Sequence, residues 1–446
     1  MSTSTTHILP IRRRWIFLGA CALLLVVGSS FRRLALSSAT GLQPLVEPLA
    51  QDPHIQVYFN QSEASVYTEP YREVERHGDD LEKVILDAIA SATTSIDVAV
   101  QTLNLPLVAE ALAEQASQGI QVRLILENQY SQADGEQAIA LQQLSNSQVL
   151  RLDDTADGSK GSGLMHHKFV VIDSRVVVTG SANFTQSGIH GDADKPESRG
   201  NANVLLRIED LAIAQKFTEE FNLMWGDGPG DRPDSQFGLQ KPPRPAQPLT
   251  LPSGTLTLQF SPTSSTLPWE QSVNGLIART LSQSTRSVEL ALFVFSEQAI
   301  ANQLETQTTQ GTQLRALIDP GFTYRSYSEA LDMLGVALPN RHCKIETDNR
   351  LWRRPIESVG MPTLPEGDKL HHKFAVVDDT TVIVGSQNWS HAANTENDET
   401  LLVIRNPTVA AHFNREFERL YRAPELGKTD KLAWKIAEAK ERCPGF

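Results

Sequence analysis

The feature that most constrains this chain is an internal duplication, because a repeated order of elements must be built from two copies of one fold. Each half opens with an alternating strand that ends at or next to an aromatic residue, IQVYFN in the first half and LTLQFS in the second. Two further strand-like segments recur in the same order. The matching pairs are residues 55–60 with 256–261, 95–103 with 287–295, and 119–127 with 311–319.

The repeated unit alternates short apolar strands with helices. After the first strand, Leu81, Val84, Ile85, Ala88 and Ile89 follow a spacing of three and four, which is typical of an amphipathic helix. Such alternation predicts the α/β class, with two similar α/β/α lobes and mostly parallel, buried central sheets. Each half ends in a helix whose aromatic residues recur every fourth position and are expected to pack in the core. They are Phe217, Phe221 and Trp225, matched by Phe413, Phe417 and Tyr421.

A proline-rich stretch separates the two halves. Residues 241–254 contain KPPRPAQP and then Pro252 and Gly254, a composition typical of a semi-rigid extended linker. We therefore expect a first lobe at residues 52–240, a linker at 241–254, and a second lobe with a C-terminal helix at 255–446. Residues 1–51 are expected to be a targeting or anchoring segment followed by a linker.

The N-terminal segment has the layout of a signal sequence or a membrane anchor. Three arginines at residues 12–14 precede an uncharged run at residues 15–31, and two more at residues 32–33 follow it. As a helix this run would span about 25 Å, against ~30 Å for a hydrocarbon core. The arginines directly after the run favour an uncleaved anchor, and the alternative is an export signal cleaved at Ser37-x-Ala39. The arginine bias predicts an extracytoplasmic body.

The remainder of the chain is acidic, with 35 Lys and Arg residues against 53 Asp and Glu residues after residue 41. An acidic body is repelled by phosphate polymers at long range, which weighs against a processive nucleic-acid binder but allows a local basic cleft. The three cysteines, Cys21, Cys343 and Cys443, show no metal-ligand spacing. A Cys343–Cys443 disulfide would suit an exported chain, although most such distant pairs are free thiols.

Each half carries the same long motif, H-x-K-x4-D-x6-G-S-x-N. The first half reads HHKFVVIDSRVVVTGSANFTQSG and the second reads HHKFAVVDDTTVIVGSQNWSHAA. One short match would be a weak signal, since a histidine beside a lysine is usually a surface pair, but two long matches at equivalent places are specific. The candidate site residues are His166, Lys168, Asp173, Gly180, Ser181 and Asn183, followed by His371, Lys373, Asp378, Gly385, Ser386 and Asn388.

The spacing of the motif predicts which side chains act together. Residues two apart on a strand face the same side, so His166 projects with Lys168, and His371 projects with Lys373. Serine and asparagine residues add neutral hydrogen-bond donors. Two imidazoles, two ammonium groups and neutral donors suit a dianionic, phosphorane-like transition state. Because lysines supply the positive charge, we predict that the site needs neither a metal ion nor a cofactor.

The doubled H-x-K-x4-D signature resembles that of the phospholipase D superfamily, over about residues 55–425. The resemblance implies two lobes related by pseudo-two-fold symmetry, with the motifs meeting at their interface. It also implies a phosphohistidine intermediate: one histidine attacks phosphorus, and the other protonates the leaving group and then activates water. By resemblance His166 is the nucleophile and His371 the general acid and base, although the sequence itself does not break the symmetry.

The chain departs from the family pattern at one position. Members usually carry an acidic residue downstream of G-S-x-N that orients a histidine; the second half has Glu399 there, but the first half has Asn203. If the acid acts across the lobes, as the family suggests, Glu399 supports His166 and leaves His371 less supported. The acidic residues that could substitute in the first half are Asp192, Asp194 and Glu197.

The shared site does not choose among the phospholipases D, cardiolipin synthases, cardiolipin hydrolases and nucleases of the superfamily. The N-terminal segment and the acidic body favour phospholipid substrates at a membrane surface, and thus a membrane-anchored or, after cleavage, secreted phospholipase D. The alternative is a nuclease or cardiolipin-hydrolase-like phosphodiesterase. A synthase would be expected to have two spanning helices, and a non-catalytic member would not keep both motifs intact. With both motifs in one chain, we expect a monomer.

Overall fold

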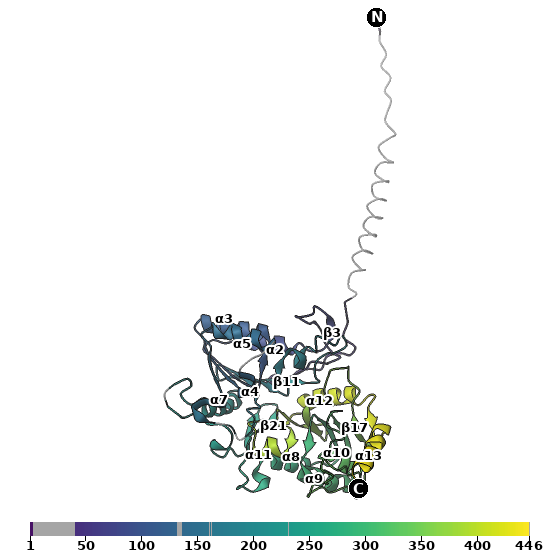
Figure 1. The fold of residues 1–446 in the computed structure, drawn as a ribbon. Helices are drawn as coiled ribbons and strands as arrows, with labels where there is room; N and C mark the ends of the chain where they lie inside the picture. Colours follow the sequence, from purple (N-terminus) through teal and green to yellow (C-terminus); the bar gives the residue numbers. More distant parts are fainter. Residues whose placement is uncertain (3–40, 132–135, 160, 162, 231, 446) are drawn as a thin grey trace. The chain divides into compact units, whose positions relative to one another are not determined.

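The duplicated segments of the sequence form two similar mixed β-sheets in the computed structural model, each covered by helices (Figure 1). The structure describes residues 1–446 except 3–40, 132–135, 160, 162, 231 and 446. Residues Pro44–Phe446 form one unit and Met1–Gln43 another. The predicted anchor at residues 15–31 lies outside the described residues, among which no helix is both long and apolar enough to span a membrane.

The first lobe is built on a sheet of strand order β1-β11-β9-β8-β4-β6-β7. Helices α2, α3 and α5 supply one buried face of this sheet, and α7 lies on the other. The elements are β1 Ile55–Phe59, β2 Val66–Thr68, β3 Glu75–His77, α2 Leu81–Ala90, β4 Ser95–Val100, β5 Leu103–Asn104, α3 Pro106–Ser117, β6 Gln121–Leu126, α4 Asn128–Ser131, α5 Glu136–Ser145, β7 Leu150–Asp153, η1 Ala156–Gly158, β8 Lys168–Ile172, β9 Val176–Gly180, β10 Phe184–Thr185, α6 Gln186–Ile189, β11 Val204–Glu209 and α7 Leu211–Trp225.

The second lobe repeats this plan with strand order β12-β13-β21-β19-β18-β14-β16-β17-β22. Helices α8, α9 and α10 pack on one face, and α12 takes the place of α7 on the other. The elements are η2 Gly238–Gln240, β12 Gln247–Leu251, β13 Gly254–Phe260, η3 Trp269–Gln271, α8 Val273–Leu281, β14 Ser287–Leu292, β15 Phe295–Ser296, α9 Gln298–Thr309, β16 Gln313–Ile318, α10 Glu329–Met333, β17 Val359–Met361, β18 Lys373–Val377, β19 Thr381–Gly385, β20 Trp389–Ser390, α11 His391–Thr395, β21 Thr400–Arg405, α12 Pro407–Leu420, β22 Glu425–Leu426 and α13 Asp430–Arg442.

The α/β class and the two similar lobes are confirmed, but the sheets are mixed rather than mostly parallel. In the first lobe β4, β6 and β7 run parallel, whereas the pairings from β1 through β11, β9 and β8 to β4 are antiparallel. The reason lies in the motif itself. The chain reverses after β8 at Asp173 and Ser174, whose φ angles are 51° and 50°. A connection this short allows only antiparallel pairing with β9, since parallel strands need a long crossover.

Aromatic residues of the repeated helices join the two lobes. Phe217 of α7 contacts Phe260 at the end of β13, with ring centroids 5.3 Å apart. The symmetric contact is between Phe413 of α12 and Phe59 at the end of β1, also at 5.3 Å. All four rings belong to one hydrophobic cluster that draws on both lobes. Each buried ring contributes about 1.5–3 kcal/mol, so this predicted core packing also fixes the lobes against each other.

The proline-rich segment is part of the fold and not the extended linker that its composition predicts. Strand β12 pairs antiparallel with β13 across the whole of Gln247–Leu251. Lys241, at the start of the segment, has a fully buried ammonium group 2.7 Å from Asp398. Prolines fit here because an edge strand leaves some of its N–H groups without a ladder partner. Residues 247–251 of the predicted linker therefore form the edge strand of the second sheet.

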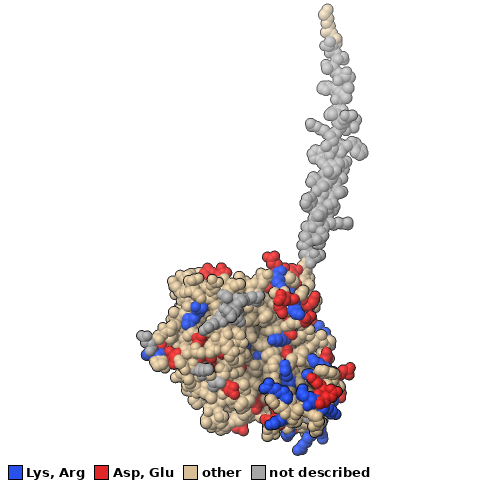
Figure 2. Space-filling model, in the orientation of Figure 1, with Lys and Arg blue, Asp and Glu red and all other residues tan. Residues whose placement is uncertain are grey.

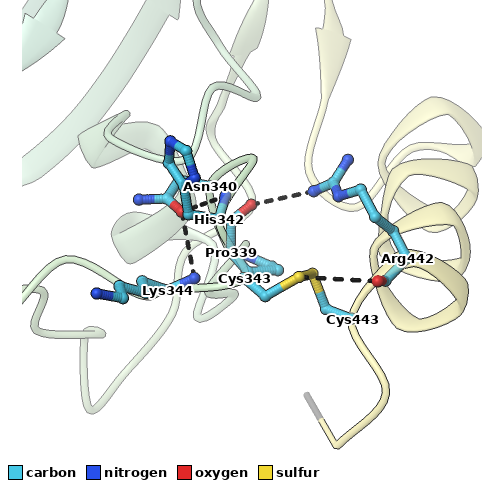
Figure 3. Close-up of a disulfide and its surroundings, with 7 residues drawn as sticks. All are labelled: Pro339, Asn340, His342, Cys343, Lys344, Arg442 and Cys443. Carbon is cyan, nitrogen blue, oxygen red and sulfur yellow. Dashed lines mark hydrogen bonds between the residues drawn. A yellow bond between two sulfur atoms is a disulfide. The ribbon is translucent and has the colours of Figure 1, made fainter.

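A disulfide closes the C-terminal part of the second lobe. Cys343 and Cys443 are bonded, with Cα atoms 5.4 Å apart (Figure 3). The bond ties the residue that follows α13 to the loop after α10, and the Arg442 guanidinium also donates to the Pro339 carbonyl at 3.3 Å. Of the two states that the sequence left open, the structure holds the disulfide and not the free thiols.

Candidate active site

The two motif histidines are positioned by backbone contacts that cross between the lobes. The His166 N–H donates to the Asp398 carbonyl at 3.0 Å, next to a parallel bridge between Met165 and Asp398. The symmetric bond joins the His371 N–H to the Ala202 carbonyl at 3.1 Å. Each histidine therefore sits on an extended segment that belongs to one lobe and is paired with the other. Both side chains are buried.

Side-chain contacts across the lobes orient both imidazole rings. His166 Nδ1 lies 2.7 Å from Glu399 Oε2, and His371 Nδ1 lies 3.0 Å from Asn203 Oδ1. The Asn203 amide is oriented by its other bond, because Nδ2 donates to the Gly188 carbonyl at 2.9 Å and a carbonyl can only accept. Both rings therefore donate through Nδ1–H and leave Nε2 for chemistry. The cross-lobe pairing of His166 with Glu399 agrees with the expectation from the family resemblance.

Two lysines supply positive charge beside the histidines. Lys168 Nζ donates to the His166 carbonyl at 2.8 Å, and Lys373 Nζ donates to the His371 carbonyl at 2.8 Å. Both side chains are fully buried. Burial lowers the pKa of Lys168 to about 7, with Glu399 opposing the shift, and burial also lowers the pKa of Lys373 well below its ordinary value. An anion bound between the two ammonium groups would restore their charge.

The two histidines differ electrostatically. Burial lowers the pKa of His166 to about 4, although the Glu399 carboxylate works in the opposite direction. The pKa of His371 is lowered well below its ordinary value by burial first, and then by the charges of Lys373, Lys168 and His166. The Nδ1 partner of His371 is the neutral Asn203 amide, where His166 has the Glu399 carboxylate.

An aromatic pair flanks His371. Phe293 follows β14 and lies 4.8 Å from His371, ring centroid to ring centroid, and 4.6 Å from Phe322. Lys373 Nζ lies 4.8 Å from the same Phe293 ring. The equivalent position after β4 is Gln101, since both residues donate their backbone N–H to the second histidine of their motif. The side of the site that holds His371 is therefore the more apolar one.

The serines and asparagines of the motifs take different parts. Ser181 Oγ donates to Asn203 Oδ1 at 2.8 Å, so it helps to hold the amide that orients His371. The two serines share a backbone contact, because Ser386 Oγ accepts the Thr400 N–H at 2.9 Å and Ser181 Oγ accepts the Val204 N–H at 3.1 Å. Asn183 and Asn388 each have a buried side-chain oxygen without a hydrogen-bond partner in the described part of the chain. Their predicted contact with a bound phosphate stays a prediction.

Asp173 and Asp378, predicted as catalytic from the motif, are not brought to the histidines. Each lies beyond the far end of its motif strand, five residues from the lysine, or ~17 Å along an extended chain. Asp173 accepts hydrogen bonds from residues 93–95, and Asp378 accepts them from residues 285–287. Burial raises the pKa of Asp173, but these bonds outweigh it and lower the pKa. Both carboxylates therefore fix a turn and the start of a strand, at a distance from the histidines.

Two further carboxylates at the site were missed by the motif. Glu127 Oε2 accepts the Met165 N–H at 2.7 Å, and Asp319 Oδ2 accepts the Leu370 N–H at 2.9 Å, so each holds the residue before a catalytic histidine. Burial raises the pKa of Glu127 to about 7, with the charge of Asp154 adding to the effect. The sequence could have indicated these two residues, because the repeat aligns Glu127 with Asp319 at the end of matched strands.

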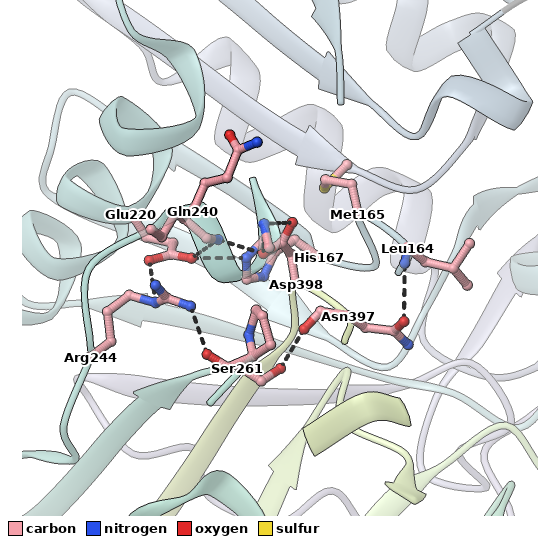
Figure 4. A network of polar contacts seen from close by, with 12 residues as sticks. Leu164, Met165, His167, Glu220, Gln240, Arg244, Ser261, Asn397 and Asp398 are labelled. Carbon is pink, nitrogen blue, oxygen red and sulfur yellow. Dashed lines mark hydrogen bonds and ion pairs between the residues drawn. The ribbon is translucent and has the colours of Figure 1, made fainter. Parts of the chain in front are cut away.

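The second histidine of each motif points away from the site into a buried polar network. His167 Nδ1 lies 2.9 Å from Thr400 Oγ1, and its Nε2 faces Glu220 (Figure 4). Glu220 in turn pairs with Lys241 and Arg244. His372 makes the equivalent contact to Glu416 at 2.9 Å. These charges are buried but paired, so they serve to fix the strands beneath the site.

Comparison with known proteins identifies the family. The family described as "Cardiolipin synthase, PLD-like domain" matches residues 85–225 and 277–421, which is more than half of the chain and includes both motifs. The chain belongs to this phospholipase D-like family. Both motifs, with their histidines and lysines, lie within the matched residues.

Two named relatives each match about a third of the chain. It is 32% identical over 149 residues to a mitochondrial cardiolipin hydrolase of Xenopus tropicalis, covering 33% of this chain and 63% of that protein. A phospholipase D of Rickettsia conorii is 30% identical over 139 residues, covering 31% of this chain and 61% of its own length. The chain thus matches less than two thirds of the length of these relatives.

One solved structure follows nearly the whole chain. The phosphatidylserine synthase of Haemophilus influenzae Rd KW20 covers 88% of this chain and 95% of its own, with a TM-score of 0.53 and 14% identity. At that identity the likeness supports the two-lobed fold alone. It agrees with the arrangement of two similar lobes in a single chain.

Proposed function

We propose that the chain is a phospholipase D-type hydrolase that cleaves a phosphodiester bond of a phospholipid through a phosphohistidine intermediate. The observation that carries the proposal is the pair of buried histidines, each with Nδ1 bonded to an acceptor of the opposite lobe. This arrangement leaves one Nε2 atom from each lobe for the chemistry. Two buried lysines beside them suit the dianionic, phosphorane-like transition state of phosphodiester cleavage.

In the first step, the Nε2 lone pair of His166 attacks phosphorus and the bond to the leaving-group oxygen breaks. A pKa of about 4 keeps this imidazole neutral near pH 7, as a nucleophile must be. Glu399 accepts the Nδ1–H bond and stabilises the positive charge that develops on the ring. His371, protonated on Nε2, gives that proton to the departing alkoxide.

In the second step, water attacks the phosphorus of the intermediate. His371 Nε2 takes a proton from this water, the P–N bond breaks, and neutral His166 is regenerated. The lowered pKa of His371 suits this basic role. For the acid role, the ring needs the bound phosphodiester, whose negative charge offsets Lys168 and Lys373 and so raises the pKa of His371 toward its usual range.

The proposed substrate class rests on the relatives and on the charge of the body. Relatives of this chain are named cardiolipin hydrolase and phospholipase D, and both names refer to lipid phosphodiesters. Figure 2 shows Lys and Arg side chains interspersed with Asp and Glu on the face drawn, without a continuous basic track. A basic groove is what single-stranded nucleic acid generally binds. Hydrolysis of cardiolipin or of nucleic acid is the second candidate, favoured by the cardiolipin hydrolase relatives.

The proposed location is the extracytoplasmic side of a membrane. Disulfides persist in oxidising compartments, and the Cys343–Cys443 bond supports export of the body. The uncharged run at residues 15–31 would serve as its anchor. Fractionation of host membranes with protease protection tests this proposal. Full-length protein in the cytoplasmic fraction would contradict it, and a soluble exported form shortened near Ala39 would contradict the anchor alone.

A panel of substrates tests the activity. The full chain would be assayed in EDTA with vesicles of phosphatidylcholine, with vesicles that contain cardiolipin, and with a single-stranded DNA oligonucleotide. We expect release of phosphatidic acid from lipid, in EDTA, because lysines supply the positive charge. Cleavage of DNA with no lipid hydrolysis would overturn the lipid proposal. Activity that EDTA abolishes and a divalent ion restores would overturn the metal-free mechanism.

A further inference from the structure

Two connections are longer in the first lobe than at the matching places of the second, and they contact each other. Between β1 and α2 the first lobe forms the β2–β3 hairpin, where the second lobe has the short η3 helix between β13 and α8. Between β10 and β11 the first lobe has residues 186–203, against residues 391–399 between β20 and β21. Residues 190–199 of the longer connection are called the accessory loop below. This loop is an addition to one lobe of the duplicated fold.

The side chain of Arg72, in the turn of the β2–β3 hairpin, holds the accessory loop by its backbone. Its guanidinium donates to the carbonyls of His190 at 2.6 Å, of Asp192 at 3.3 Å and of Ser198 at 3.3 Å. Glu69 fixes the same guanidinium, because its carboxylate accepts from Arg72 Nε at 2.9 Å. A guanidinium presents its donors in a rigid planar fork, so this one side chain holds both ends of the accessory loop.

The accessory loop ends on a carboxylate of the second lobe. Ser198 Oγ donates to Asp368 Oδ1 at 2.5 Å, and the Arg199 N–H donates to Asp368 Oδ2 at 2.9 Å. Ser198 is buried, and Asp368 lies three residues before His371. The hairpin, the accessory loop and the segment that leads to His371 are thus connected by one series of hydrogen bonds across the lobe interface.

The chain runs from the accessory loop directly into the residues that hold His371. The Lys369 N–H donates to Asn201 Oδ1 at 2.9 Å, and the His371 N–H donates to the Ala202 carbonyl at 3.1 Å. Asn203, the next residue, lies 3.0 Å from the Nδ1 atom of the same histidine. A shift of the accessory loop would therefore move the groups that place this histidine.

The matching position in the first lobe has no side chain for such a contact. Three residues before His166 lies Gly163, and a Cβ atom there would collide with Asn397 Oδ1. A carboxylate is therefore excluded at this place. The bond between a side chain and the opposite lobe that Asp368 makes belongs to the side of His371 alone.

We propose that Arg72 and Asp368 are positioning residues that hold His371 in place for proton transfer, acting through the accessory loop. The inference rests on the proposed function, in which His371 Nε2 gives a proton to the leaving group and then takes one from water. A misplacement of about 1 Å at a reacting group can lower a rate about 10²-fold, so a small shift of this segment is measurable. Asn203 sets the direction of the ring, and the accessory loop sets the position of the backbone that carries it.

The test is a double-mutant cycle in the full chain, with kcat and KM measured on phosphatidylcholine vesicles. We expect Asp368→Ala and Arg72→Ala each to lower kcat about tenfold and to leave KM unchanged, because both act through His371 and not through the substrate. The double variant should lose about as much as either single variant, since both substitutions release the same loop. Asp368→Asn keeps one acceptor oxygen and should lose less. Glu366→Ala removes the exposed partner of Lys195 on the same segment and should keep the wild-type kcat.

Urea unfolding of each variant separates positioning from a merely structural role. A structural role would lower the midpoint of unfolding and leave the kcat of the folded enzyme at the wild-type value, which would overturn the inference. Losses that multiply in the double variant would also overturn it, because Arg72 and Asp368 would then act independently. If Arg72→Ala does not fold, the same cycle is run with Ser198→Ala in its place.

The outcome for the wild type separates this inference from the proposed function. If the wild-type chain cleaves only the single-stranded oligonucleotide, the lipid proposal fails, and the cycle is run on the oligonucleotide with the same expectations for kcat and KM. If the wild type cleaves lipid and folded Asp368→Ala keeps its kcat, the inference alone is overturned. A rise in KM at unchanged kcat would overturn it as well, since Asp368 would then act on substrate binding.

Discussion

Replacing Asn203 with aspartate would test whether the missing carboxylate sets the protonation of His371. Asn203 Oδ1 accepts the Nδ1–H of His371 at 3.0 Å, at the place where Glu399 serves His166 at 2.7 Å. In Asn203→Asp, a negative charge would face the ring. An opposite charge favours the imidazolium, so the pKa of His371 rises.

The magnitude follows from the change in hydrogen-bond type. A charge-assisted hydrogen bond contributes about 1.5–3 kcal/mol, against about 0.5–1.5 kcal/mol for a neutral one. The difference of about 1.4 kcal/mol corresponds to one pKa unit. The same substitution removes the bond from Asn203 Nδ2 to the Gly188 carbonyl. An unsatisfied buried carbonyl costs about 1–3 kcal/mol, so the variant should have a lower free energy of unfolding, even though the protonated form of His371 is stabilised.

The assay is the pH dependence of kcat, which reports ionisations in the enzyme–substrate complex. His371 must be protonated to act as the acid, so activity falls as pH rises through its pKa. In Asn203→Asp this falling limb should move up by about one pH unit. Glu399→Gln is the matched control, because it should move the low-pH limb of His166 downward and leave the high-pH limb in place. A folded Asn203→Asp enzyme with an unmoved high-pH limb would refute the reasoning.

Four further substitutions probe the mechanism and the fold. His166→Ala and His371→Ala should each lower kcat by at least about 10²-fold, and either variant retaining more than about a tenth of the wild-type turnover would contradict the two-histidine mechanism. Asp173→Ala should lower the free energy of unfolding, measured in urea, by about 2–4 kcal/mol, because its hydrogen bonds are lost, while the folded enzyme keeps its kcat. A fall in kcat without a fall in stability would instead indicate a catalytic role for Asp173. Cys343→Ser should destabilise the second lobe by about 2–5 kcal/mol, and equal stability with and without reductant in the wild type would argue against the bond.

The parts of the site that could be predicted from sequence are those encoded by local spacing and by repetition. Alternation along a strand places His166 with Lys168, and the duplication shows that the second lobe repeats the pair. The partner of His166 needed one more step, because Glu399 lies in the other lobe. The family resemblance supplied that step, and the contact of 2.7 Å agrees with it.

The parts that could not be predicted depend on contacts between distant segments. Asp173 is spaced like a catalytic residue, but it follows the end of β8 that is far from His166. The spacing of a motif does not reveal where a strand ends. Lys241 lies in a proline-rich stretch that resembles a solvated linker, yet its charge is buried because Glu220 and Asp398 converge on it. Glu127 lies outside the motif, and only the fold brings it beside Met165.

The departures from symmetry gather around one histidine. Both lobes hold their histidines with the same backbone bonds, and both lysines bond to the preceding histidine carbonyl. The differences at Asn203 and Phe293 both concern His371, since Asn203 accepts its Nδ1–H and the Phe293 ring lies 4.8 Å from its ring. A nucleophile and a general acid need different surroundings, because one must stay neutral and the other must change its protonation within each turnover. A duplicated fold supplies two equal positions. In the proposed mechanism, the neutral surroundings of His371 suit the acid and base, and Glu399 beside His166 suits the nucleophile.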